Sequence, residues 1–154
     1  LRPIFEKIKL SLNDFDAREN VLNCIKAAKW CCDNKLYQQA TTMLEEGLGT
    51  FLCCHYQLDY KNKTYRDTVF SCIAIKTKKT ATEVLDADKE LVDKILADDS
   101  VWGNKTFVTI LQQVVELRND YNHAGFKKNP FSAKKVIEKI EELLDGIEEV
   151  LSEI

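Results

Sequence analysis

The chain has 154 residues, of which 45% are hydrophobic and 31% charged, and its formal net charge at pH 7 is −3. This length and composition are typical of one folded domain, and five glycines and two prolines are too few for an architecture of strands and tight turns. We therefore predict an all-α fold. The overall charge decides nothing about nucleic acid, because a polyanion site needs only a local basic patch.

The sequence contains no run of eighteen apolar residues and no charged N-terminal segment followed by an apolar one. Nothing therefore indicates membrane insertion or secretion, and we expect a cytoplasmic protein without a membrane partner. Residue 1 is a leucine, and the sequence begins within an apolar pattern that is already under way. We expect residues 1–15 to be a linker or the end of a preceding domain, and residues 16–154 to form one helical domain.

A first helix is predicted from Asp16, because Asp16 and Glu19 have the spacing of a capping box. Apolar residues then recur with helical period at Val21, Cys24, Ile25, Ala28 and Cys32. Residues 33–35 interrupt the pattern, and a second apolar series runs from 36 to 52 in spite of two glycines. These two helices should form a long antiparallel hairpin.

The middle of the chain is harder to interpret. Residues 57–65 are polar and predict a turn, whereas YRDTVFSCIAIKTK (65–78) fits either a short helix or a strand because it is rich in β-branched residues. DADKELVDKILADDS (86–100) predicts a short amphipathic helix. The structure of residues 60–105 is thus left open in part.

Two helices are predicted for the C-terminal third. The first runs from about Thr106 to Ala124, before a plausible helix stop at Gly125, and Ser132 can cap the second. In this final helix the apolar residues are spaced alternately by four and three: Val136, Ile140, Leu143, Ile147, Val150 and Ile154. Such a stripe packs either into the domain's own core or into a dimer interface, and the pattern alone does not separate the two.

The six cysteines lie in apolar, helical stretches rather than in loops: Cys24, Cys31, Cys32, Cys53, Cys54 and Cys72. We interpret them as reduced, buried thiols. A zinc site built from the two adjacent pairs and His55 is conceivable, but neighbouring cysteines on a helix point about 100° apart. We predict no metal and no cofactor.

The helix at 106–124 carries an arginine where packing favours a leucine. At about 100° per residue, an apolar stripe is predicted to contain Phe107, Ile110, Leu111, Val114 and Tyr121. Arg118 falls within this stripe, so we expect its guanidinium to point inward, toward a partner or a wet cleft. A buried salt bridge to a carboxylate such as Asp120 or Glu116 of another element is the structural explanation.

Other polar side chains cluster near Arg118. Asn119 and His123 are four residues apart and share a helix face, as do Arg118 and Asn122. His123 lies in the last turn, where the helix dipole favours an imidazolium and places proton transfer near neutral pH. Arg118 and His123 are about 140° apart around a regular helix, so a two-fold axis would be needed to bring such groups onto one atom.

These residues resemble a known family. Arg118-Asn119-Asp120-Tyr121-Asn122-His123 is similar to the arginine-polar-x-x-x-histidine motif of HEPN ribonucleases, and LRNDYNHAGFKKNPFSAKKVIEKIEELL resembles the C-terminal end of HEPN domains in CRISPR-associated CARF–HEPN proteins of type III systems. The resemblance implies a HEPN-like helical bundle with a motif helix and a final helix. It further implies a homodimeric, metal-independent endoribonuclease in antiviral defence. Cyclic oligoadenylate would bind only through a CARF sensor, which is not in this sequence.

The chemistry of RNA cleavage suits the same side chains. Attack of the 2′-hydroxyl on the adjacent phosphate of single-stranded RNA needs proton transfer, which His123 can perform, and stabilisation of a dianionic phosphorane, which Arg118 can provide. Asn119 can act with them, and Asn122 can orient the phosphate. Basic residues follow the motif and can contact the RNA backbone: Lys127, Lys128, Lys134 and Lys135.

Two alternatives remain open. The first is a non-catalytic HEPN-like module for RNA binding or regulatory dimerisation, and the second is a structural scaffold with Arg118 in a salt bridge.

Overall fold

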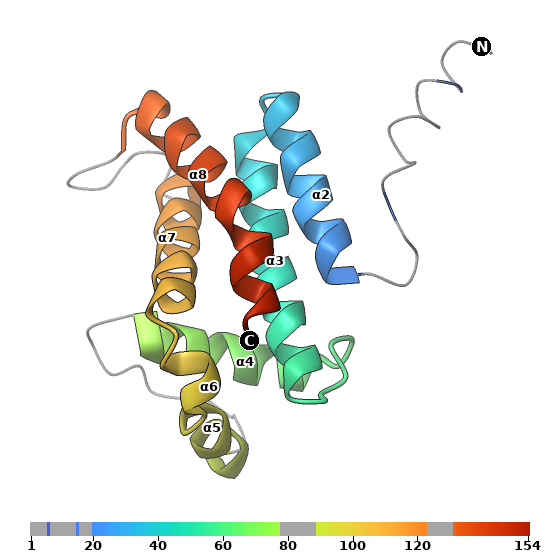
Figure 1. Cartoon of the computed structure of the whole chain (residues 1–154), viewed down its shortest axis with the longest axis vertical. Helices are drawn as coiled ribbons and strands as arrows, with labels where there is room; N and C mark the ends of the chain where they lie inside the picture. The colour runs from blue at the N-terminus through green and yellow to red at the C-terminus, as the bar shows by residue number, and fades with distance from the viewer. Residues whose placement is uncertain (1–5, 7–14, 16–19, 78–88, 123–130) are drawn as a thin grey trace.

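The computed structural model describes residues 6, 15, 20–77, 89–122 and 131–154. Every regular element in these ranges is a helix, which confirms the all-α prediction (Figure 1). The elements are α2 (Asn20–Asp33), α3 (Tyr37–His55), α4 (Lys63–Thr77), α5 (Lys89–Leu96), α6 (Asp99–Trp102), α7 (Lys105–Asn122) and α8 (Ala133–Ser152). The start predicted at Asp16 and the stop predicted at Gly125 lie outside the described residues, and the domain boundary at residue 15 stays a prediction.

Helices α2, α3, α7 and α8 stand side by side and alternate in direction, with α2 and α7 running one way and α3 and α8 the other (Figure 1). The predicted α2–α3 hairpin is confirmed. It turns at Lys35, whose φ of 61° is left-handed, and the amide of Leu36 donates to the carbonyl of Cys31 at 2.8 Å. These contacts satisfy carbonyl groups at the end of α2, as in many helix C-termini.

The two glycines of α3 are explained by close approach of its neighbours. A Cβ at Gly47 would lie 2.8 Å from the Cβ of Cys24 on α2, and one at Gly49 would lie 2.6 Å from the ring of Phe70 on α4. A larger side chain at Gly47 would push α3 away from α2, and one at Gly49 would displace the ring of Phe70. The helix therefore continues through both glycines because tertiary packing outweighs their low helix propensity.

The segment that fitted either a helix or a strand is helical. In Figure 1, α4 lies crosswise to α3 and α7, and it buries Val69, Cys72 and Ile73 against them. Its Thr68 hydroxyl donates to the carbonyl of Thr64 at 3.0 Å, so this β-branched residue is compatible with the helix. The amphipathic helix predicted at 86–100 is observed as α5 followed by the one-turn α6.

The final helix begins as predicted, with the Ser132 side chain accepting from the amide of Lys135. Its apolar stripe packs into the chain's own core, where five members are buried: Val136, Ile140, Leu143, Ile147 and Val150. Burial of one such side chain contributes about 1.5–3 kcal/mol. The stripe is therefore used within the chain, so it carries no argument for a dimer.

In the described ranges, no helix has both the length and the apolar character needed to cross a bilayer.

Candidate functional groove

Arg118 does not point into the core, so its predicted place in the buried stripe is wrong, although its guanidinium does meet a partner beside a groove. Its side chain is 47% exposed, whereas its neighbour Leu117 is fully buried and Asp120 is 6% exposed. Near the end of α7 the buried positions are Leu117 and Asp120, and the carboxylate of Asp120 accepts from the amide of Phe131 at 2.9 Å. Arg118 lies on another side of the helix.

The guanidinium of Arg118 meets a carboxylate of α3. Its Nε lies 3.1 Å from Oε2 of Glu45, whose side chain is only 13% exposed. Burial raises the pKa of Glu45, the positive charge of Arg118 opposes this rise, and the adjacent Glu46 adds to it. The expected salt bridge therefore exists, but its carboxylate is that of Glu45 and not that of Asp120 or Glu116, the partners that were predicted.

A surface groove of about 520 Å³ opens beside this pair, between α3, α4 and α7. Arg118 and Asn119 line one wall. Charged residues from the other two helices and the turn between them also line it: Glu45, Glu46, Lys61, Lys63, Arg66 and Asp67. Four cationic and three acidic side chains thus line the groove together with the apolar Phe70, Ile73, Ala74 and Val115, so it can hold a charged group beside an apolar one.

Arg66 is a second arginine of this groove, which sequence reasoning missed. It forms an ion pair with Glu46, donates to the hydroxyl of Thr50 at 3.1 Å and to the carbonyl of Tyr60 at 3.4 Å, and lies over the ring of Phe70. Only 20% of its side chain is exposed. Arg66 therefore fastens α4 to α3, and the adjacent acidic pair of α3 was the feature that could have suggested a basic partner.

The structure places only part of the predicted site. Arg118 and Asn119 lie together on the groove wall, and Asn122 is the last residue of α7. Three other predicted site residues lie outside the described residues: His123, Lys127 and Lys128. Lys134 and Lys135 are exposed in the first turn of α8.

Comparisons with protein-family models, curated proteins and solved structures found no match. The HEPN resemblance therefore stands on the motif residues alone, and function has to be argued from the groove and its chemistry.

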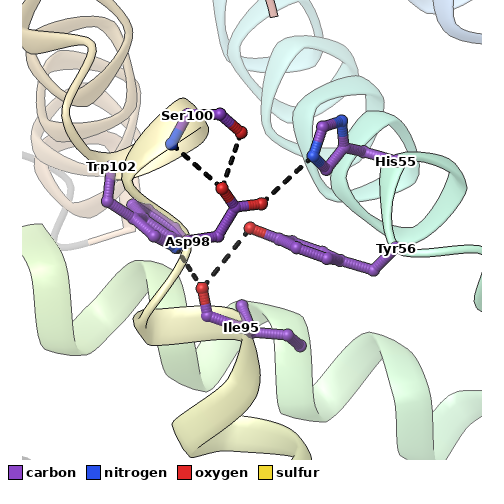
Figure 2. A network of polar contacts seen from close by, with 6 residues as sticks. All are labelled: His55, Tyr56, Ile95, Asp98, Ser100 and Trp102. Carbon is purple, nitrogen blue, oxygen red and sulfur yellow. Dashed lines mark hydrogen bonds and ion pairs between the residues drawn. The ribbon is translucent and has the colours of Figure 1, made fainter.

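A second polar cluster joins α3 to α6 (Figure 2). The carboxylate of Asp98 accepts from the amide and hydroxyl of Ser100 at 2.9 and 2.6 Å and contacts Nε2 of His55 at 3.3 Å. These hydrogen bonds, those from Ser100 first, lower the pKa of Asp98. His55 and Ser100 both bind the carboxylate rather than each other, so the cluster does not activate the serine as a nucleophile. Its role is to cap α6 and hold it on α3.

Below Asp98, the hydroxyl of Tyr56 and the indole nitrogen of Trp102 both donate to the carbonyl of Ile95, at 3.4 and 2.7 Å (Figure 2). Burial, followed by the nearby Asp98 carboxylate, raises the pKa of Tyr56. The phenol therefore stays protonated at physiological pH and serves as a donor that ties α3 to the end of α5.

The cysteines are free thiols, of which Cys31, Cys53 and Cys72 are buried while Cys54 is exposed, contrary to the prediction that all six are buried. Burial raises the pKa of Cys32 and of Cys72 to about 11, so both stay protonated at neutral pH and are poor nucleophiles. Among the residues that the structure describes, no three His, Cys, Asp or Glu side chains are grouped as metal ligands.

Proposed function

We propose that this chain is a metal-independent endoribonuclease that cleaves single-stranded RNA by attack of a 2′-hydroxyl on the adjacent phosphate. The observation that carries the proposal is the position of Arg118, which is half-exposed on the wall of an open groove, with Asn119 on the same wall. An arginine in the core could not reach a phosphate, whereas this one can. The HEPN-like motif supplies the remaining groups.

The residues would divide the reaction between them. Arg118 offers paired N–H donors to the phosphorane oxygens. Asn119 can bind a phosphate or ribose oxygen beside it. His123 would transfer the proton of the 2′-hydroxyl and return one to the leaving 5′-oxygen. Since the nucleophile belongs to the substrate, DNA could bind but would not be cut.

Symmetry would complete the site. Because Arg118 and His123 are about 140° apart on a regular helix, two protomers that pair their α7 helices across a two-fold axis would bring both kinds of residue to one cleft. We therefore include a homodimer in the proposal. Asn122, Lys127 and Lys128 would contact the RNA next to the scissile phosphate, and the biological setting would be type III CRISPR antiviral defence.

The Arg118–Glu45 ion pair favours a second candidate function. In a purely structural domain, this pair would join α7 to α3 and no RNA would be cut. A third possibility is a HEPN-like module that binds RNA in the same groove or regulates dimerisation, but does not cleave RNA.

One substrate separates these candidates. Single-stranded RNA should be cleaved in excess EDTA and leave 2′,3′-cyclic phosphate or 3′-phosphate ends, and a 2′-deoxy substitution at the scissile nucleotide should stop cleavage there while binding persists. His123→Ala should abolish turnover. Cleavage at the deoxy position, or dependence on a metal ion, would contradict the proposed mechanism. Binding without cleavage by a verified dimer would favour the non-catalytic module.

A further inference from the structure

The strongest unassigned feature of the groove is Glu45, the residue that holds Arg118. The carboxylate contacts Nε, at the inner edge of the guanidinium, with Nε and Oε2 separated by 3.1 Å. A guanidinium has five N–H donors in one plane, and a contact at Nε leaves the four on the two Nη atoms for another oxyanion. Glu45 therefore occupies the edge of Arg118 that a phosphate does not need.

Glu45 is largely buried and Arg118 is half-exposed, as expected if the first residue orients the second. Glu45 is 13% exposed and belongs to α3, which is wedged between α2 and α4 by the close approaches at Gly47 and Gly49. Arg118 is 47% exposed and reaches over the groove. A fixed carboxylate on a rigid helix thus restrains a long, flexible side chain at the point where it enters solvent.

The pair is also poorly suited to a purely stabilising role. Burial raises the pKa of Glu45 in spite of the positive charge of Arg118, and the neighbouring Glu46 raises it further. The ionised carboxylate is therefore held where folding alone disfavours it. Such unfavourable placement of a charged group is frequent in functional sites.

We infer that Glu45 is a positioning residue that orients the guanidinium of Arg118 toward a substrate phosphate in the groove. This inference rests on the proposed ribonuclease function. Glu45 itself makes no contact with the reacting atoms: it acts through Arg118 alone. Its loss should reduce turnover, because a misplaced guanidinium stabilises the transition state less than a fixed one.

The test compares three variants of the full chain in RNA cleavage: Glu45→Ala, Glu45→Gln and, as control, Glu148→Ala. Glu148 forms a half-exposed ion pair with Lys29 at 2.9 Å, away from the groove. Glu45→Ala should lower kcat by about tenfold or more with little change in KM. Glu45→Gln should recover much of the loss, since an amide oxygen can take the same place beside Nε, and Glu148→Ala should match the wild type.

A second measurement tests the Glu45–Arg118 contact independently of RNA cleavage. In NMR spectra the Nε–H signal of Arg118, assigned by its absence in Arg118→Lys, should exchange slowly with solvent in the wild type and in Glu45→Gln but rapidly in Glu45→Ala. If the wild type cleaves RNA and Glu45→Ala has an unchanged or increased kcat, the inference is overturned while the proposed function stands. If the wild type cleaves no RNA, the proposed function fails, and slow exchange that depends on Glu45 then assigns the pair to the scaffold.

Discussion

The Asp98 cluster and the Arg118 groove both join α3 to a later helix through a carboxylate, but the two carboxylates are in opposite electrostatic situations. Asp98 accepts from Ser100 twice and contacts His55, and its pKa is lowered. Glu45 is desolvated beside Glu46, and its pKa is raised in spite of Arg118. The burial of Glu45 and the donors that converge on Asp98 thus shift the two pKa values in opposite directions, although both carboxylates take part in an ion pair.

The largest expected effect concerns Arg118. Arg118→Ala should lower RNA cleavage by about 10²–10³-fold, the effect of removing one preorganised donor from a transition-state site. The same change should lower the free energy of unfolding by about 1 kcal/mol or more, because it leaves the largely buried carboxylate of Glu45 without its counter-charge. Cleavage assays and thermal melts would be run beside Lys29→Ala, which breaks the ion pair with Glu148. Equal losses of activity in both variants would contradict a specific role for Arg118.

The next effect concerns the Asp98 cluster and should appear in stability alone. Asp98→Ala removes the cap of α6 and the partner of His55, and should lower the free energy of unfolding by about 1–2 kcal/mol. Asp99→Ala, at the exposed neighbouring position, is the control and should have an effect of about 0.5 kcal/mol or less. RNA cleavage by the folded Asp98 variant should be unchanged, and a selective loss of kcat would show that this cluster also serves the site.

The two carboxylates should also differ in how they respond to pH. Since the pKa of Asp98 is lowered on folding, its contribution to stability is complete above the ordinary aspartate pKa and is lost as the pH falls through the lowered value. The stability difference between wild type and Asp98→Asn should therefore shrink on acidification below about pH 4. Chemical denaturation of both proteins between about pH 2 and pH 7 would measure this difference. A stability difference that grows toward acid pH would contradict the described hydrogen bonds of Asp98.

These contrasts also show what the sequence could reveal. Helix periodicity, the Ser132 cap and the α2–α3 turn are local features, so the all-α fold, the hairpin and the final helix were predicted correctly. The orientation of Arg118 was not, because it depends on which side of α7 the other helices cover, and only the folded chain shows this. For the same reason Glu45 could not be identified as its partner, since the two residues meet only through helix packing.

The smallest expected effect is a gain of stability in Glu45→Gln. A raised pKa means that the contribution of Glu45 is present below the ordinary glutamate pKa and is lost as the pH rises through the raised value. At neutral pH a neutral glutamine should therefore increase the free energy of unfolding, by about 0.5 kcal/mol or less. The matched variant Glu46→Gln should instead lower it, because Arg66 is largely buried against Glu46. If Glu45→Gln lowered the free energy of unfolding as much as Glu46→Gln, the two neighbouring carboxylates would not differ in the way proposed.

The alternating arrangement of α2, α3, α7 and α8 has a consequence for the order in which the chain folds. The α2–α3 hairpin pairs neighbouring segments and should form early, whereas the groove needs α7 to dock on α3 after the intervening α4–α6 has been placed. Amides of α3 should therefore gain protection in pulsed hydrogen exchange before those of α7. A chain released from synthesis would pass through a stage in which its hairpin is formed but Glu45 and Arg118 have not yet met, so the groove would be among the last features to mature.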